Sequence, residues 1–508
     1  MGKMALLGMM AALVAGNAPG AHPGNQAVNR RRKGTDPLNG VVKVDVVSAT
    51  PDIFYPWRTE LEEGTGSGVV LEGHRILTCA HVAAGATHLT VTKRSTDDPF
   101  PARVEFLDND CDLALLTVDD EDFFDDIEPI PFGESPQVRM QVVVAGYPMG
   151  GEGLSFTEGI VSRVELQPYL QSFRRLPAAQ IDAAVNPGNS GGPVLDRETE
   201  RLVGIAMQTR DDGEGLGYII PLEIIRHFFA DCEDGHIDGF GSPGFSIQTL
   251  ESADSRRFLK MRKGQTGVRI YSTAAWMDTA NGPRTGDVLL AIDGLPVSDL
   301  GKIRRGDGVA RDWTEQVSTK QIGEPIVYSL LRRGKLLTVT NQVSLDHTRV
   351  RPWLAGKAPD YFIFGGLVFT TLTMDFYAQV KQTPEGTFDA PRFEGDDIVM
   401  LSEVLQDPVN MDYPGLRWPV ATVDGKPVKN LRELAQRFDE CTKPWIEFEV
   451  SVTSDRAQGQ RLWCVLDTEK CRAALPGILR RYQVPADRSD DLRNDVNHAD
   501  ISPKTEEH

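Results

Sequence analysis

Short apolar runs broken by turn residues constrain the fold of this chain more than any other feature of its sequence. Between Val41 and Pro221 these runs are rich in β-branched residues and are separated by Gly, Pro, Asp and Asn. Such a pattern predicts an all-β barrel or sandwich. Helical periodicity is found only at the end of this region, where Leu222–Phe229 predicts a helix that closes the domain. The predicted strands include Val41–Val47, Gly68–Leu71, Ile76–Cys79, Leu89–Thr92, Leu113–Val118, Gln141–Ala145, Gly159–Val164, Leu202–Ala206 and Gly217–Ile220.

A repeated motif indicates two further domains after this β-rich region. Ile292–Leu300 and Val423–Leu431 both follow the pattern apolar-Asp-Gly-x-Pro-Val-x-(Asp/Asn)-Leu. In each copy the Asp-Gly pair favours a tight turn between two strands, and we expect a short helix after it. The repeat predicts two similar domains of roughly a hundred residues each. Two unrelated hairpins are the alternative.

The composition narrows the classes of function. The chain has 508 residues, enough for about three or four domains, and its formal net charge is −19. Such a charge repels nucleic acid, so we expect no nucleic-acid partner. The six cysteines form no Cys-x-x-Cys pair, which argues against a metal site and favours buried free thiols. A disulfide between Cys464 and Cys471 stays open.

The two ends of the chain differ from the rest in composition. Lys3 precedes the apolar run Met4–Ala15, which has the shape of a signal peptide and is too short to span a membrane. Arg30–Lys33 follows as a solvated tether or a nuclear targeting patch. We expect a periplasmic or other exported or organellar location, with an intracellular one as the alternative. Residues 484–508 are polar and lack aromatic side chains, which predicts a disordered tail.

The segment Asn186–Pro193 carries the pattern that a nucleophilic serine needs. Ser190 lies among glycines that allow a tight turn and the close approach of a substrate backbone. Backbone N–H groups beside such a serine bind the developing oxyanion. We therefore predict Ser190 as the nucleophile and an oxyanion hole formed by Gly188, Asn189 and Ser190. A glycine-rich turn without catalytic meaning is the alternative, which the residues upstream disfavour.

A histidine and a carboxylate precede this serine. His81 follows an apolar strand, and Asp112 comes directly before another. In a serine hydrolase the imidazole takes the proton of the serine hydroxyl, and a buried carboxylate holds the imidazole in the right tautomer. Asp110 is the rival for the acid, and we choose Asp112 because it abuts the apolar run and would be half buried. Asp108 and Asp110 are interpreted as solvated turn residues.

Three motifs thus occur in the order His, Asp, Ser. They are Thr78–His81, Asp112–Leu116 and Gly188–Pro193. They resemble the motifs of the HtrA/Deg serine proteases of the chymotrypsin clan, and Gly66–Val70 and Gly217–Pro221 resemble the opening and closing strands of that family. The resemblance implies a mainly β fold, with a chymotrypsin-like double β-barrel followed by two PDZ-like α+β domains. The layout is most similar to the plant-type Deg proteases and their bacterial relatives.

The domain plan follows from the motifs and the resemblance. It comprises an N-terminal tail at 1–36, a trypsin-like protease domain at 37–235, a first PDZ domain at 236–350, a PDZ-like second domain at 351–483 and a tail at 484–508. The resemblance also implies a homo-oligomer, either a trimer or a multiple of trimers. The aromatic cluster in Phe54–Trp57 suits a contact between subunits, or equally a strap over the subunit's own core.

Two residues near the serine differ from those of digestive trypsins. Asn189 stands where trypsins have the Asp that pairs with a freed N-terminus, so we expect no activation by zymogen cleavage. The resemblance implies instead that loops at Gly146–Phe156 and Gln208–Gly215 become ordered when ligand binds. Ala184 offers no carboxylate to meet Arg or Lys, so we predict cleavage after small or aliphatic residues. The predicted pocket residues are Ala183, Ala184, Val185 and Ile205.

The first of the repeated domains is predicted to bind peptide C-termini. Thr285–Gly294 resembles a PDZ core strand and turn, and Pro243–Ile247 resembles the carboxylate-binding loop and ligand strand. Such a loop aims backbone N–H groups at a terminal carboxylate while the peptide adds a strand to the sheet. In the second domain Gly365–Val368 is a poorer match, so this domain either binds peptide or serves in packing and assembly. The predicted peptide-binding residues are Gly244, Phe245, Ser246 and Ile247.

These features together predict an ATP-independent serine endopeptidase that degrades unfolded or damaged proteins and is modulated by its PDZ domains. The sequence contains no Gly-x-x-x-x-Gly-Lys-(Ser/Thr) motif, and we expect no cofactor. The alternative function is that of a PDZ-containing chaperone or scaffold with a silent protease barrel. A processing protease of narrow sequence specificity would differ only in its substrate.

Overall fold

The computed structural model describes most of the chain from residue 37 onward. The described residues are 37–149, 153–169, 172, 174–209, 216–233, 235–274, 276–306, 308–345, 348–354, 356–380, 395–411, 413, 417–452 and 460–493. The predicted signal-like segment and the basic cluster Arg30–Lys33 lie outside them. No helix within these ranges combines the length and the apolar character needed to cross a bilayer.

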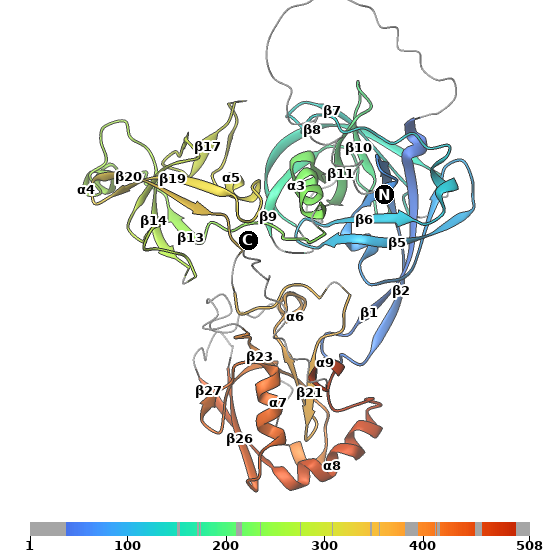
Figure 1. Cartoon of the computed structure of the whole chain (residues 1–508), viewed down its shortest axis with the longest axis vertical. Helices are drawn as coiled ribbons and strands as arrows, with labels where there is room; N and C mark the ends of the chain where they lie inside the picture. Colours follow the sequence, from blue (N-terminus) through green and yellow to red (C-terminus); the bar gives the residue numbers. More distant parts are fainter. Residues whose placement is uncertain are drawn as a thin grey trace, which may run out of the picture. The chain divides into compact units, whose positions relative to one another are not determined.

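Antiparallel strands close into barrels in the N-terminal half of the described chain, which confirms the mainly β prediction (Figure 1). The strand order is β1-β2-β3-β6-β5-β4 in the first barrel and β10-β11-β12-β9-β8-β7 in the second. Side chains alternate between the inside and the outside, as in β1, where Val44 and Val46 are buried and Asp45 is not. The strands are β1 (Val41–Pro51), β2 (Thr59–Leu71), β3 (Arg75–Thr78), β4 (Ala86–Lys93), β5 (Pro99–Asp108), β6 (Leu113–Val118), β7 (Gln141–Gly146), β8 (Ser155–Pro168), β9 (Arg175–Ile181), β10 (Pro193–Asp196), β11 (Leu202–Thr209) and β12 (Gly217–Pro221).

Hydrophobic packing joins the two barrels. One cluster of buried side chains includes Val44 and Leu115 of the first barrel and Ile205 of the second. Helix α3 (Leu222–Cys232) adds Phe228 to the same cluster, so the predicted closing helix is present and extends beyond its predicted end. Because the barrels share a core, loops that end at their seam are held in fixed positions relative to each other. The short elements here are the 3₁₀ helices η1 (Pro37–Gly40) and η2 (Glu121–Phe124) and helix α2 (Ala80–Ala83).

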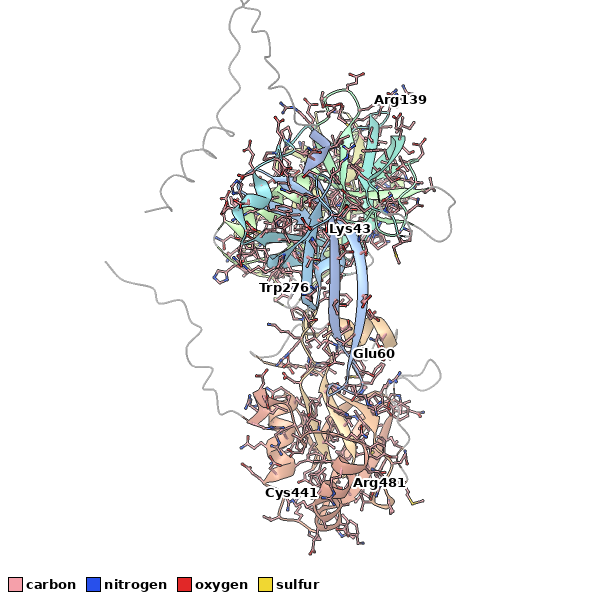
Figure 2. The ribbon with its side chains drawn as sticks, turned by 90° about the vertical axis from the view of Figure 1, so that its right-hand side faces the viewer. Lys43, Glu60, Arg139, Trp276, Cys441 and Arg481 are labelled. Atoms are coloured by element: carbon pink, nitrogen blue, oxygen red, sulfur yellow. The ribbon has the colours of Figure 1, made fainter. Side chains whose placement is uncertain are left out.

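The hairpin of β1 and β2 is long, and Figure 2 labels Lys43 and Glu60 along it. Its tip carries the aromatic cluster Phe54–Trp57. The ring of Phe54 lies 5.3 Å from that of Phe376, and the ring of Trp57 lies 5.3 Å from that of Tyr361. These aromatic side chains therefore pack within their own chain, against the second PDZ-like domain.

The first PDZ domain is built on a sheet with the strand order β13-β14-β15-β19-β20. The predicted Asp-Gly turn is present, since Asp293 and Gly294 have φ values of 46° and 80° and join Ile292 to Leu295. A short helix follows this turn as expected, but only after the strand pair β17 and β18. The elements are β13 (Phe245–Gln248), α4 (Ala253–Phe258), β14 (Val268–Thr273), β15 (Val288–Ile292), β16 (Leu295–Pro296), β17 (Lys302–Arg304), β18 (Ala310–Asp312), α5 (Glu315–Ser318), β19 (Pro325–Arg332) and β20 (Lys335–Gln342).

The second PDZ-like domain repeats this plan with additions at both ends. Its sheet has the order β21-β22-β23-β24-β26-β27, and its Asp424-Gly425 turn is followed by the predicted helix α7. Cys464 and Cys471 lie in its core as free thiols, not as a disulfide. The elements are β21 (Tyr361–Phe364), β22 (Leu367–Thr371), α6 (Met374–Val380), β23 (Val399–Val404), η3 (Pro408–Asn410), β24 (Trp418–Val423), β25 (Lys426–Pro427), α7 (Leu431–Asp439), β26 (Trp445–Ser451), β27 (Arg461–Asp467), α8 (Thr468–Arg481) and α9 (Asp490–Arg493).

The prediction that disorder begins at residue 484 is wrong for its first part. Val484 is 6% exposed, and the backbone N–H of Ile363 donates to Asp487 O at 2.7 Å. Arg488 pairs with Asp439 at 2.7 Å. These contacts hold residues 484–493 on the second PDZ-like domain. The polar composition of the segment gave no sign of them in the sequence. Residues 494–508 lie outside the described residues.

Candidate active site

His81 and Asp112 contact each other at the end of the first barrel. His81 lies in α2, directly after β3, and Asp112 precedes β6 with a left-handed φ of 56°. His81 Nδ1 is 2.8 Å from Asp112 Oδ2, and the backbone N–H of His81 donates to Asp112 Oδ1 at 2.9 Å. The Asp112 side chain is 2% exposed and that of His81 is 26% exposed. A buried carboxylate thus holds one ring nitrogen of an imidazole that still reaches solvent.

The surroundings of His81 act on its pKa in opposite directions. Burial lowers the pKa, whereas the negative charge and the hydrogen bonds of Asp112 raise it by more. The pKa of His81 therefore lies above its ordinary value of 6.5. A histidine held in this way is a stronger base when it takes a proton.

The structure separates Asp112 from its rival Asp110. Asp110 pairs with Arg174 at 2.8 Å and accepts the Ser172 hydroxyl on its backbone carbonyl at 2.9 Å. These contacts hold Asp110 against the second barrel, away from His81. Of the two carboxylates, Asp112 is the one that contacts the histidine.

Asp108 is not the solvated turn residue that the sequence predicted. It ends β5 and is 6% exposed, with one carboxylate oxygen accepting the N–H of Asp110 at 2.8 Å and the other 3.2 Å from Cys111 Sγ. Burial and the nearby charge of Asp110 raise its pKa to about 7. Asp108 thus braces the turn that carries Asp112 from inside the protein.

Ser190 enters the site from the second barrel. It lies on the turn before β10, and its backbone carbonyl accepts the N–H of Ser67 in the first barrel at 2.9 Å. Its hydroxyl donates to Met207 O at 3.1 Å, and no described contact joins it to His81. Hydrogen bonds of this kind are often unformed without substrate and tighten when it binds.

The turn before Ser190 requires glycine. Gly188 has a φ of 96°, and a Cβ there would lie 2.4 Å from Tyr147 O. At Gly191 a Cβ would lie 2.2 Å from Ser67 O.

Among the described residues, the N–H groups of Gly188 and Ser190 donate to no other residue, which leaves them open to an oxyanion. The predicted participation of Asn189 is wrong, because its N–H donates to Asn186 O at 2.9 Å.

Ser67 is a site residue that the sequence analysis missed. Its hydroxyl donates to Gly188 O at 2.7 Å and accepts the N–H of Tyr147 at 2.8 Å. One side chain of β2 thereby fixes two loops of the second barrel beside the oxyanion turn. The pattern that points to it is Gly66-Ser67-Gly68, a small polar residue between glycines directly before the apolar run Val69–Leu71.

The predicted pocket residues all lie in the second barrel, but only one keeps an accessible side chain. Ala183 and Val185 are buried in one hydrophobic cluster and Ile205 in another, with exposed fractions of 1%, 5% and 0%. Ala184 is half-buried, and its carbonyl accepts the Thr157 hydroxyl at 2.9 Å. Residues 150–152 and 210–215 of the loops expected to order on ligand binding lie outside the described residues.

Cys79, His81 and Asp112 place potential metal ligands within 4.8 Å of one another. Metal binding needs a thiolate at Cys79. Burial and the charge of Asp112 instead raise the pKa of this thiol well above its ordinary range, and Cys79 Sγ contacts Ala206 O at 3.3 Å. The donor set therefore suits a protonated thiol packed beside the His81–Asp112 pair better than a metal centre.

Comparison with known proteins agrees with this geometry. Family models of the trypsin-like peptidase domain and of the PDZ domain match residues 66–205 and 350–491. Protease Do-like 2, chloroplastic, from Arabidopsis thaliana is 33% identical over 471 residues, which cover 90% of this chain and 75% of that protein. Protease Do-like 4, mitochondrial, from the same plant is 32% identical over 88% of this chain and 84% of its own length. The chain belongs to the Do-like (HtrA/Deg) family of serine proteases.

Two more distant matches complete the comparison. Serine protease DegP homolog from Plasmodium falciparum is 26% identical over 80% of this chain and 59% of its own length. Among solved structures, HtrA-type protease AlgW with tripeptide is 26% identical with a TM-score of 0.46, and the match covers 60% of this chain and 94% of that one. The relatives establish this Do-like protease as a serine endopeptidase with a PDZ domain.

The predicted peptide-binding segment of the first PDZ domain lies at a sheet edge. Among the described strands β13 pairs only with β14, so its outer edge is open to an added strand (Figure 1). Phe245 is buried and stacks on Trp313 at 5.1 Å, while Ser246 is exposed and Ile247 half-buried. Gly244 has a φ of 68°, and a Cβ there would lie 2.7 Å from the ring of Trp276.

In the second PDZ-like domain the corresponding edge is filled by the chain itself. The repeated Asp-Gly turn makes β24 the counterpart of β15, so β22 corresponds to the ligand strand β13. Strand β21 pairs with β22 at this edge. A Cβ at Gly365 would lie 2.6 Å from Cys471 Sγ, so the Gly365-Gly366 turn is packed rather than open. This arrangement favours the packing alternative for the second domain.

The buried carboxyl of Asp108 predicts a pH-dependent stability. Its pKa is about 7 in the fold and 3.8 as an ordinary value, so between these limits the folded protein binds a proton that the unfolded chain has lost. Stability from this group is therefore present below about pH 4 and is lost as the pH rises towards 7. Asn at position 108 does not ionise, so Asp108→Asn should not lose stability as the pH rises. At pH 8 its free energy of unfolding should exceed that of the wild type by about 1 kcal/mol or more.

Thermal unfolding at pH 5 and pH 8 checks this expectation. The advantage of Asp108→Asn should grow between the two pH values, whereas Asp119→Asn, at an exposed ion pair, should follow the wild type. An equal pH dependence in Asp108→Asn and the wild type would contradict the buried, titrating carboxyl.

Proposed function

We propose that Ser190, His81 and Asp112 form the catalytic triad of an ATP-independent endopeptidase that cleaves unfolded or damaged proteins. The observation that carries this proposal is the 2.8 Å contact between His81 and the buried Asp112, beside a serine on a glycine turn. Histidine and carboxylate come from one barrel and serine from the other, a seam that the shared hydrophobic core keeps rigid. Substrate bound along this seam would meet all three groups.

The proposed reaction begins when substrate turns the Ser190 hydroxyl from Met207 O towards His81 Nε2. The hydroxyl oxygen attacks the scissile carbonyl carbon, and its proton passes to Nε2. Asp112 stabilises the resulting imidazolium through Nδ1, and the free N–H groups of Gly188 and Ser190 bind the oxyanion. His81 then gives its proton to the leaving amine, and the C–N bond breaks. His81 next takes a proton from a water molecule, whose oxygen attacks the acyl carbon. The bond from that carbon to Ser190 Oγ then breaks as His81 returns the proton to Oγ.

Substrate preference in this proposal follows from Ala184. A methyl side chain offers no negative charge for a cationic residue, and buried Ala183 and Val185 give the surrounding wall an apolar character. Small or aliphatic residues before the scissile bond should therefore be cleaved best, because an unpaired charge is costly to bury.

Location and assembly are part of the same proposal. Two relatives carry the words chloroplastic and mitochondrial in their names, which favours an exported or organellar compartment for this protease. We also propose a homo-oligomer, a trimer or a multiple of trimers. The hairpin-tip aromatics Phe54 and Trp57 pack on the second PDZ-like domain of the same chain, which favours the strap alternative for them.

Ser190→Ala tests the nucleophile. The variant should lose cleavage of casein by a factor on the order of 10⁴ or more, because the covalent step is removed. Ser95→Ala, an exposed serine elsewhere on the first barrel, should cleave like the wild type. A fluorophosphonate probe should label the wild type and not Ser190→Ala. Equal cleavage of casein by the wild type and Ser190→Ala would refute the assignment. A wild type that suppresses aggregation but is not labelled by the probe would favour the chaperone function.

The open edge of β13 predicts binding of peptide C-termini. A peptide with a free terminal carboxylate should bind more tightly than its C-terminal amide by about tenfold, because charge-assisted hydrogen bonds to the Gly244 loop are lost in the amide. Fluorescence anisotropy with the full chain of Ser190→Ala measures both affinities without cleavage. Equal affinity of the two peptides would show that the loop does not recognise the carboxylate.

A further inference from the structure

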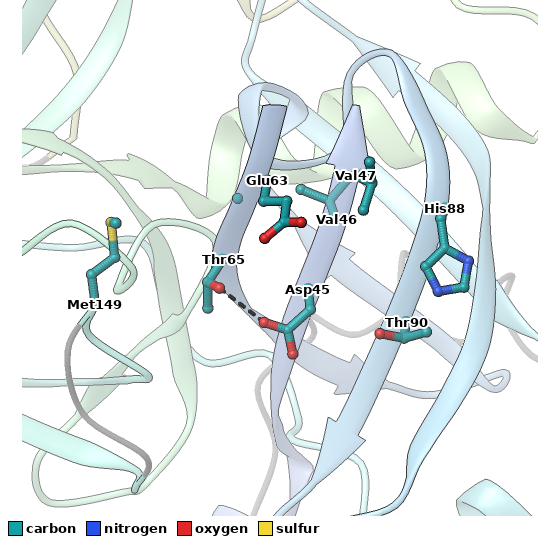
Figure 3. Close-up of a pocket in the computed structure, with 9 residues that line it drawn as sticks. Asp45, Val46, Val47, Glu63, Thr65, His88, Thr90 and Met149 are labelled. Carbon is teal, nitrogen blue, oxygen red and sulfur yellow. Dashed lines mark hydrogen bonds between the residues drawn. The ribbon is translucent and has the colours of Figure 1, made fainter. Parts of the chain in front are cut away.

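A hollow of about 330 Å³ is lined by residues of β1, β2 and β4 in the first barrel and by Met149 of the second. Its base is the outer face of three neighbouring strands, β2, β1 and β4. Two cross-strand rows cover this face, as Figure 3 shows. One row contains Thr65, Asp45 and Thr90, and the other contains Glu63, Val47 and His88.

One face of β2 leads from the hollow towards the turn that carries Ser190. Because side chains alternate along a strand, Glu63 and Thr65 point to the same side as Ser67. Ser67 on that side bonds to Gly188 O. The opposite bank is Met149, whose N–H donates to Pro187 O at 2.8 Å and whose side chain is 68% exposed. A chain bound along this face of β2 would therefore run from the hollow towards the turn that carries Ser190.

The position of the hollow assigns it to one side of the scissile bond. The pocket of Ala184 and the carbonyl of Met207, which the Ser190 hydroxyl contacts, belong to the second barrel. The hollow instead extends from Ser67, on the other flank of Ser190, and so faces the leaving group. Glu63 is four residues from Ser67, about 13 Å along a strand, which an extended substrate spans in about four residues.

Charge gives the hollow its selectivity. The carboxylate of Asp45 is engaged by Lys43 at 2.8 Å and by the Thr65 hydroxyl at 2.8 Å. The exposed carboxylate of Glu63 makes no ion pair or hydrogen bond with any described residue. Val47 beside it and Met149 opposite are apolar surfaces along which the stem of a long cationic side chain can lie.

We propose that this hollow is a leaving-group subsite in which Glu63 selects a Lys or Arg side chain among the four residues after the scissile bond. The proposal rests on Ser190 as the nucleophile and adds a second determinant to the aliphatic preference before the bond. It also fits an enzyme of net charge −19, which attracts cationic segments of unfolded chains. Because Glu63 is exposed, the expected preference is modest, about two- to fivefold at low salt.

Cleavage of matched peptides by the full-length protein tests the proposal. The peptides share one sequence before the scissile bond and carry Lys, Met or Glu in turn at each of the first four positions after it. The wild type should show a two- to fivefold higher kcat/KM for Lys than for Met at one or more positions. Glu63→Gln should abolish this ratio, and Glu63→Lys should shift the preference to Glu. High salt should reduce the wild-type ratio.

Glu62→Gln is the matched control. Glu62 is the next residue along β2, has the same charge and points to the opposite face of the strand, so its loss should leave the ratio unchanged. A wild type without a Lys preference at any position, a preference retained in Glu63→Gln, or an equal loss in Glu62→Gln would overturn the proposal. Cleavage retained in Ser190→Ala would instead refute the nucleophile, so the two failures are distinguishable.

Discussion

The contact between Asp112 and His81 is the interaction on which the rest of the site depends. A carboxylate that is 2% exposed is costly to keep ionised unless hydrogen bonds stabilise it. Asp112 obtains these bonds from the ring and the backbone N–H of the same histidine. The backbone accepts a left-handed conformation at Asp112 to bring this about, and the buried Asp108 braces the turn from behind. The hydrogen bonds that stabilise the buried carboxylate of Asp112 therefore also fix the orientation of the His81 imidazole.

The second constraint is the position of one barrel relative to the other. Ser67 of the first barrel bonds to Gly188, Tyr147 and Ser190 of the second, so the oxyanion turn is positioned by the barrel that carries the histidine. The same strand, β2, continues away from Ser190 as one bank of the hollow that we propose as a leaving-group subsite. In this proposal one strand links the geometry of the oxyanion hole with the surface that contacts the leaving part of the substrate.

Local sequence patterns predicted the elements and much of the site, and contacts between distant segments account for the rest. Strand spacing predicted an all-β barrel or sandwich, and the family resemblance implied the double barrel. The motifs around His81, Asp112 and Ser190 located the groups that the fold brings to one seam. The sequence did not show that Asp108 is buried or that the N–H of Asn189 is occupied, since both depend on turn geometry. It also could not show that residues 484–493 pack on the second PDZ-like domain, because polar anchors such as Arg488 resemble those of a disordered tail.

The pH dependence of kcat/KM in Asp112→Asn tests the central contact most directly. In the proposed mechanism neutral His81 is the active form, and Asp112 raises its pKa above 6.5, so wild-type activity should be lost as the pH falls through a midpoint above 6.5. Asp112→Asn should lower kcat/KM by about 10⁴ and move this midpoint to lower pH, while Asp110→Asn should keep the wild-type midpoint. An unchanged midpoint in Asp112→Asn, or the same shift in Asp110→Asn, would contradict the account.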